Sequence, residues 1–129
     1  MNTDSRPVHL NLFLIRMAIM AIMSILHRAS GALLVLAIPY FAYLLGISLE
    51  SEAGFAQAVD QLSGVFAKLI LLTLGWSVLH HLLSGIRFLL IDFDIGVNTT
   101  TARVTAWVVT ITAALISLTA GAIILRGAV

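Results

Sequence analysis

Three long stretches of this chain contain no charged residue, and they constrain the fold more than any other feature. They cover residues 29–49, 69–86 and 104–125. Each is close to the ~20 residues that a helix needs to cross ~30 Å of hydrocarbon. Because a backbone in lipid must satisfy its own hydrogen bonds, we expect three membrane-spanning helices, at about 17–49, 63–91 and 103–126. The predicted fold class is all-α, an integral membrane three-transmembrane-helix bundle.

The composition agrees with a membrane protein and excludes several other classes. Of the 129 residues, 60% are hydrophobic and 10% are charged, and the mean hydropathy is +1.09. A soluble domain of this length carries much more charge. The formal net charge of +1 is too small for electrostatic binding, so we expect no nucleic acid partner. The chain has no cysteine, so His, Met or carboxylate side chains must hold any metal or haem.

The polar segments between the apolar stretches are short, so we expect a single membrane-anchor domain over residues 1–129. Residues 50–61 and 92–102 are predicted to be connections, and residues 1–16 an N-terminal cytoplasmic segment. The N-terminal residues lack the pattern of a cleavable signal or a transit peptide. We therefore expect the spans themselves to direct insertion, into a bacterial inner membrane.

The basic residues predict the orientation. With three crossings, the N-terminus and the second connection share a side of the membrane. Five basic residues lie on that side and two on the other, and the cytoplasmic side is normally the richer in positive charge. We therefore expect a cytoplasmic N-terminus and a periplasmic C-terminus. The five are Arg6, Arg16, Arg28, Arg87 and Arg103, and the two are Lys68 and Arg126.

A polar face opens the first apolar stretch. Successive polar or small residues here are spaced so that they share one face of a helix. They are Ser24, His27, Arg28 and Gly31. Charge beside hydrocarbon is costly, so a chain that keeps His27-Arg28 there is expected to use the pair on a ligand or a partner. The alternative for Arg28 is that its long side chain reaches the lipid headgroups. The alternative for Ser24 is a hydrogen bond to its own helix backbone.

Two adjacent histidines, His80 and His81, lie within the second stretch. An ionisable residue inside a bilayer is a functional candidate, although such a histidine can also serve packing alone. His81 is the better candidate for a haem ligand, because Gly85 lies one turn further on and lets a flat ring approach the backbone. His80 is the second candidate, and it can instead bond Ser84 or a neighbouring chain. His27 and His81 are predicted to lie at similar depth, so one cofactor could span both.

Two motifs resemble the cytochrome b membrane-anchor subunit family of succinate dehydrogenase. The first runs from Arg6-Pro7-Val8 to Ser24-x-x-His27-Arg28-x-Ser30, and the second is His81-x-x-x-Gly85-Ile86-Arg87-Phe88, ending at Asp92. Their order, the three spans and the length also match. The chain departs from the family pattern at Met17-Ala18, where a proline is common, and at Ile91 and Asp94.

The resemblance implies half of a membrane anchor in respiratory complex II. A second small three-helix anchor subunit would share one haem b with this chain, with His81 as one axial iron ligand and a partner histidine as the other. Ser24 and Arg28 match ubiquinone-site positions, and His27 and Arg28 match positions near the haem propionates. An iron–sulfur subunit would deliver electrons from a flavoprotein subunit that oxidises succinate. No residue of this chain is expected to catalyse a reaction alone.

Two further hypotheses belong to different classes. The chain could be a haem-free structural anchor or assembly subunit, whose histidines serve packing only. It could also be a small transporter component. The transporter hypothesis is disfavoured, because the sequence of the spans lacks the paired discontinuous helices that transport sites use.

Overall fold

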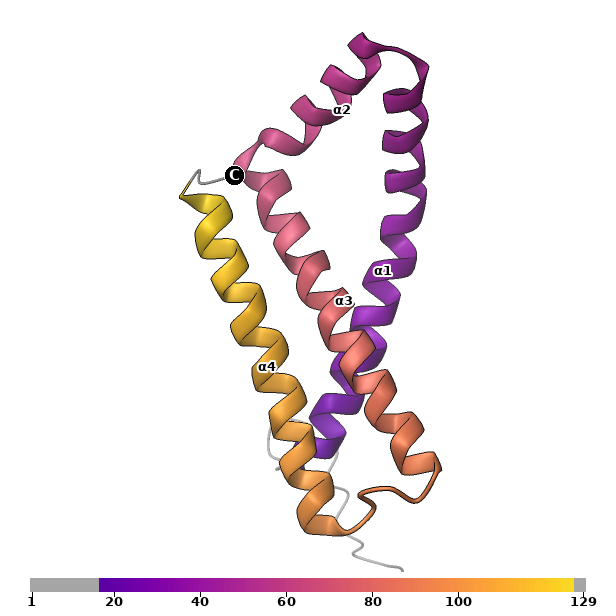
Figure 1. Cartoon of the computed structure of the whole chain (residues 1–129), viewed down its shortest axis with the longest axis vertical. Coiled ribbons are helices and arrows are strands. Elements are labelled where there is room, and N and C mark those ends of the chain that lie inside the picture. Colours follow the sequence, from indigo (N-terminus) through magenta and orange to yellow (C-terminus); the bar gives the residue numbers. More distant parts are fainter. Residues whose placement is uncertain (1–16, 127–129) are drawn as a thin grey trace, which may run out of the picture.

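The computed structural model describes residues 17–126, and the chain forms four helices within them (Figure 1). They are α1 (Ile19–Glu50), α2 (Glu52–Ser63), α3 (Val65–Asp92) and α4 (Thr99–Leu125). No strand occurs in these residues. Three helices, α1, α3 and α4, are long and apolar enough to cross a membrane. The predicted all-α fold with three spans is confirmed. The predicted cytoplasmic segment 1–16, with the Arg6-Pro7-Val8 part of the first motif, lies outside the described residues.

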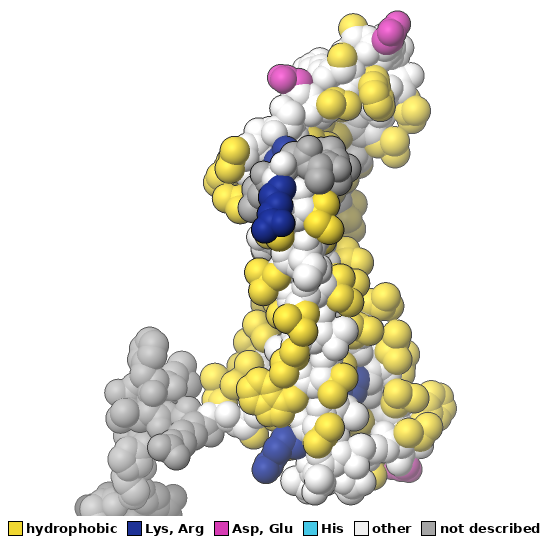
Figure 2. All heavy atoms as spheres, turned by 60° about the vertical axis from the view of Figure 1, so that its left-hand side comes forward, with side chains coloured by type: hydrophobic (Ala, Val, Ile, Leu, Met, Phe, Trp, Pro, Cys, Tyr) yellow, Lys and Arg dark blue, Asp and Glu magenta, His cyan; other side chains and the backbone are white. Residues whose placement is uncertain are grey.

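The surface of the molecule is largely apolar, as expected for a protein surrounded by lipid. Side chains such as Leu36 and Phe66 are 73% and 77% exposed. Figure 2 shows apolar side chains along the length of the molecule and charged ones toward its two ends. Exposed apolar surface on this scale marks a membrane or protein interface. The chain is therefore a multi-pass membrane protein.

The first connection differs from the prediction. Residues 50–61 were expected to be a polar connection, but most of them belong to α2. The Ser51 side chain caps this helix by accepting a hydrogen bond from the N–H of Gly54 at 3.0 Å. No helix was predicted within this connection because only its acidic residues were weighed, although an apolar residue recurs at helical spacing at Phe55, Ala58, Val59 and Leu62.

The helices α1 and α3 run in opposite directions and cross (Figure 1). They lie close together in the lower part of the view and diverge toward α2, which links their far ends. The helix α4 follows α3 along most of its length. The crossing therefore brings residues from the first half of α1 against residues from the second half of α3.

The helix α4 packs through small side chains. Ala106 and Ala113 are fully buried, and Ala102 and Ser117 nearly so. At Gly121, an added Cβ would lie 2.8 Å from a side-chain carbon of Leu72. Small residues allow close backbone approach, which is how helices in lipid gain van der Waals contact. This packing holds α4 against α3 at Gly121 and against α1 at Ala106, which clusters with Ile19 and Met23.

The turn between α3 and α4 explains one departure from the family pattern. Asp94 has a φ of 59° and Gly96 a φ of 77°, so both lie in the left-handed region. Aspartate tolerates this conformation better than most side chains. The Asn98 side chain then caps α4 by accepting a hydrogen bond from the N–H of Thr101 at 2.8 Å. Asp94 therefore allows the chain to reverse direction and start the last span.

Candidate functional site

The two predicted histidines of different helices meet at the crossing of α1 and α3. The rings of His27 and His81 stack with their centroids 4.1 Å apart and their planes at 10°. Both side chains are half-buried. The two residues were predicted to lie at similar depth in the membrane, and in the structure their rings are in direct contact.

One nitrogen of His81 is fixed by α1. Its Nδ1 lies 3.0 Å from the backbone oxygen of His27 and 3.4 Å from Oγ of Ser30. The Ser30 hydroxyl donates its own proton to the same carbonyl at 2.8 Å, and a carbonyl can only accept. Nδ1 is therefore the donor, and it carries the proton. In a neutral imidazole this leaves the lone pair on Nε2, the form in which histidine binds a metal.

Two glycines make room for the stacked rings. A Cβ at Gly31 would lie 2.8 Å from Cε1 of His81, which is closer than real contacts allow. A Cβ at Gly85 would lie 3.7 Å from Nε2 of His27, an ordinary contact distance. Each glycine follows a histidine by four residues on its own helix and faces the histidine of the other helix. Gly85 was expected to admit a flat ring, and the ring nearest to it in the structure is that of His27.

The other predicted site residues line the same part of α1. Ser24 is half-buried and Arg28 is exposed, one turn apart. Neither takes part in the hydrogen bonds that hold His81. Phe88 completes the site from α3, with its ring edge-on to His27 at 5.2 Å between centroids. The sequence predicted the histidines and Gly31, but it did not assign Ser30, whose hydroxyl supports His81.

The second candidate ligand, His80, faces a different way. It is fully buried, stacks on Trp76 at 5.1 Å between centroids, and lies 3.3 Å from Oγ of Ser84 through Nε2. This is the bond to Ser84 that the sequence offered as its alternative role. Its Nδ1 has no hydrogen-bond partner among the described residues. A flat cofactor could reach His80 only after the helices separate, so His81 is the more accessible imidazole.

Arg87 is a further buried polar residue near the site, and the sequence assigned it no role inside the bundle. It ends the second apolar stretch in the sequence, yet its side chain is only 6% exposed. It shares one stripe of α3 with Ser77, His80 and Ser84, all fully buried. The spacing of His80, Ser84 and Arg87 was the signal that could have placed it inside the bundle.

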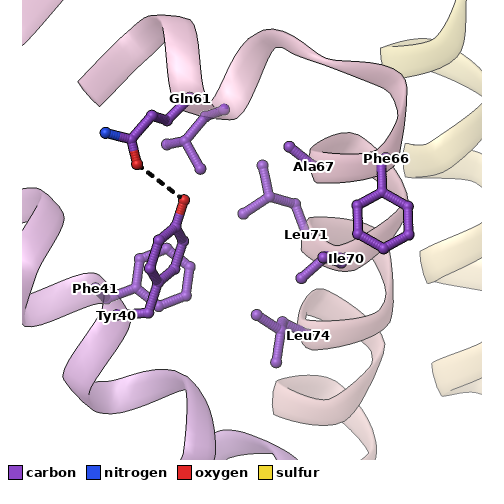
Figure 3. Close-up of a pocket in the computed structure, with 9 residues that line it drawn as sticks. Tyr40, Phe41, Gln61, Phe66, Ala67, Ile70, Leu71 and Leu74 are labelled. Carbon is purple, nitrogen blue, oxygen red and sulfur yellow. Dashed lines mark hydrogen bonds between the residues drawn. The ribbon is translucent and has the colours of Figure 1, made fainter. Parts of the chain in front are cut away.

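A cavity of about 390 Å³ lies near the opposite ends of the helices, between α1, α2 and α3 (Figure 3). Aliphatic and aromatic side chains form most of its wall. Its polar contact is a 3.4 Å hydrogen bond from the Tyr40 hydroxyl to Gln61. This lining offers neither a metal ligand nor a permanent charge. The imidazoles that could hold a cofactor therefore lie at the histidine pair and not in this cavity.

The donor set suits a haem better than a bare metal ion. Within residues 17–126, no group of three or more His, Cys, Asp or Glu side chains converges on one point. A haem brings four nitrogen ligands of its own, so the protein would need to supply few ligands, and a neutral imidazole is a common one. The protonated Nδ1 of His81 and its Nε2, which has no hydrogen-bond partner among the described residues, fit this requirement.

These features define a multi-pass helical membrane protein with an imidazole pair where two spans cross. The family model described as "Succinate dehydrogenase/Fumarate reductase transmembrane subunit" matches residues 2–120, and the chain belongs to this family.

Several bacterial proteins named succinate dehydrogenase cytochrome b556 subunit are similar to this chain. The one from Coxiella burnetii is 34% identical over 105 residues, which cover 81% of this chain and 84% of the relative. The one from Paracoccus denitrificans is 31% identical over 97 residues, 75% of each chain. The one from Rickettsia felis is 26% identical over 115 residues, 89% of this chain and 90% of the relative. The similarity extends over most of each protein, so the whole architecture is comparable.

Proposed function

We propose that this chain is a membrane-anchor subunit of succinate:quinone oxidoreductase that binds haem b through Nε2 of His81. The observation that carries the proposal is the hydrogen bond of His81 Nδ1 to the backbone oxygen of His27. Ligand histidines typically donate their second nitrogen to such an oxygen, which fixes the tautomer and the ring direction. The haem, when bound, supplies one-electron redox chemistry. The name cytochrome b556 of the relatives supports the same cofactor.

The second axial ligand is proposed to come from another small three-helix anchor subunit. The rings of His27 and His81 are parallel and in face-to-face contact, so they cannot point at one iron from opposite sides. A lone copy of this chain would also leave the haem edge and Arg28 facing lipid, which is costly. A haem shared between two anchor subunits would remove both difficulties.

The polar face of α1 is proposed to serve both the haem and a quinone. His27 and Arg28 would hold the haem propionates, and Ser24 and Arg28 would bind ubiquinone. The exposed Arg28 guanidinium suits carboxylates and a quinone oxygen that gains negative charge. The half-buried Ser24 hydroxyl can donate a hydrogen bond to the same oxygen. Arg28 is the residue that belongs to both groups.

The complex is proposed to span a bacterial inner membrane with the N-terminus of this chain in the cytoplasm. An iron–sulfur subunit would dock on that face and pass electrons from a succinate-oxidising flavoprotein to the quinone. The excess of arginines near the N-terminus and the second connection supports this orientation. His27 lies in the first half of α1 and His81 in the second half of α3, toward the same end.

The test is the reduced-minus-oxidised spectrum of the purified complex with single histidine variants. His81→Ala should abolish the b-type spectrum, because the iron loses an axial ligand, whereas His80→Ala should keep it. Normal haem in both variants would contradict the assignment of His81. A complex with intact quinone reduction and no Soret band would instead favour the haem-free structural anchor.

A further inference from the structure

The guanidinium of Arg87 is buried inside the bundle, and within residues 17–126 it bonds only to neutral groups. Its Nε donates to the Thr105 hydroxyl at 2.9 Å, and its Nη2 donates to the backbone oxygen of Ala102 at 2.8 Å. Both partners belong to the first turns of α4. The side chain is only 6% exposed, so its contacts come almost wholly from this chain. Arg28, in contrast, is exposed and available to a ligand.

The positive charge of Arg87 is not neutralised by these contacts. A guanidinium stays protonated, and neutral oxygens satisfy its hydrogen bonds without cancelling its charge. The acidic residues that follow it, Asp92 and Asp94, are exposed at the end of the helix. A buried cation without a carboxylate is expensive in a membrane protein and normally serves a function.

This charge lies close to the histidine pair. Its Cζ is 5.8 Å from the ring centroid of Phe88, and that ring lies 5.2 Å from the ring centroid of His27. Along α3, Arg87 follows His81 by six residues, which is roughly 9 Å of helix rise. One aromatic ring therefore separates the guanidinium from the stacked imidazoles. In a medium of low dielectric constant, a charge acts strongly over such distances.

We propose that Arg87 is a positioning residue that raises the reduction potential of the haem held by His81. Reduction adds one negative charge at the iron, and a fixed positive charge nearby stabilises the reduced form. This proposal rests on the proposed function, because it requires the haem. It assigns to Arg87 an electrostatic role at the redox site, in addition to the contact that joins α3 to α4.

The two roles can be separated with four variants of the whole complex. Arg87→Gln removes the charge and keeps a polar side chain, whereas Arg87→Lys keeps the charge and changes the hydrogen bonds. Thr105→Val removes one hydrogen-bond partner and leaves the guanidinium. Arg103→Gln removes an exposed arginine from the first turns of α4, and it serves as the matched control.

The measurements are the haem midpoint potential by optical redox titration and the thermal unfolding of each complex. We expect a lower potential in Arg87→Gln alone, with values near that of the unmutated complex in Arg87→Lys, Thr105→Val and Arg103→Gln. Thermal stability should fall in both Arg87→Gln and Thr105→Val. An unchanged potential in haem-containing Arg87→Gln, or an equal fall in Arg87→Lys, would overturn the proposal. Absence of haem from the unmutated complex would instead overturn the proposed function, and this proposal with it.

Discussion

The imidazole of His81 rests against that of His27, and its Nδ1 also donates to the backbone oxygen of the same residue. His27 therefore contacts His81 twice, through its ring and through its main chain. The first contact restricts the plane of the His81 ring, and the second fixes its tautomer. A substitution at position 27 can remove only the ring contact, because the carbonyl belongs to the backbone.

The arrangement around this pair is nearly symmetric. His27-x-x-x-Gly31 on α1 and His81-x-x-x-Gly85 on α3 run in opposite directions, and each histidine faces the glycine of the other helix. The two glycines are not equivalent, however. Only the Gly31 side is too tight for a Cβ, so the structure makes Gly31 the more demanding position.

Gly31→Ala should disturb His81 and lower the haem content of the complex. The new methyl group would lie 2.8 Å from Cε1 of His81, and the ring would have to move away from α1 and lose its hydrogen bond to His27. Loss of such a supporting contact typically costs about 10–100-fold in metal affinity. Haem titration of the apo complex measures this loss. Gly75→Ala is the control, because nothing lies within 4 Å of its Cβ position, and equal affinity in both variants would contradict the model.

Ser30→Ala should have a smaller effect than Gly31→Ala. It removes the hydroxyl that lies 3.4 Å from Nδ1 of His81 but leaves the shorter bond to the His27 carbonyl. We expect haem affinity to fall by about tenfold or less, since one of the two contacts of His81 Nδ1 remains. Ser48→Ala is a suitable control, because the Ser48 hydroxyl bonds its own helix and is distant from the site in sequence. An effect of Ser30→Ala larger than that of Gly31→Ala would show that the hydroxyl has another role.

The three spans were predictable because long uncharged segments have few alternatives in water or lipid. The sequence also predicted that His27 and His81 lie at similar depth in the membrane, since both are a similar distance from the charged end of a span. The stacking was not predictable, because it depends on how α1 and α3 cross. Helical spacing places His80, Ser84 and Arg87 on one stripe, but spacing alone does not show that this stripe is buried inside the bundle.

The fourth helix was missed for a different reason. The segment that forms α2 has several polar and acidic residues, and it was predicted only to be a connection between two spans. Its apolar residues nevertheless recur at helical spacing, and Ser51 provides an N-terminal cap. The burial of Arg87 was not predicted, because a charged residue at the edge of an apolar stretch usually lies at the membrane surface. Only the position of α4 shows that Thr105 and the Ala102 carbonyl receive its guanidinium.

Arg28→Leu should depress quinone reduction while leaving succinate oxidation by an artificial acceptor unchanged. The exposed guanidinium would no longer stabilise negative charge on the quinone oxygen, an interaction worth about 100-fold or more in rate at comparable sites. Steady-state kinetics with each acceptor separates the two steps. Arg103→Leu removes another exposed arginine near the same end of the bundle and should leave both rates intact. Unchanged quinone kinetics in Arg28→Leu would remove Arg28 from the quinone site.

His80→Phe should preserve both the haem and the stability of the complex. A phenyl ring can keep the stacking on Trp76, an interaction of about 0.5–1.5 kcal/mol, and it removes the unpartnered Nδ1. Ser84 would lose its partner, but a helical serine can bond a carbonyl of its own helix. His80→Ala should be worse, by about 2–4 kcal/mol, because it leaves a cavity at a fully buried position. Thermal unfolding and the b-type spectrum measured on one preparation test both statements, and loss of haem in a stable His80→Phe complex would make His80 the ligand in place of His81.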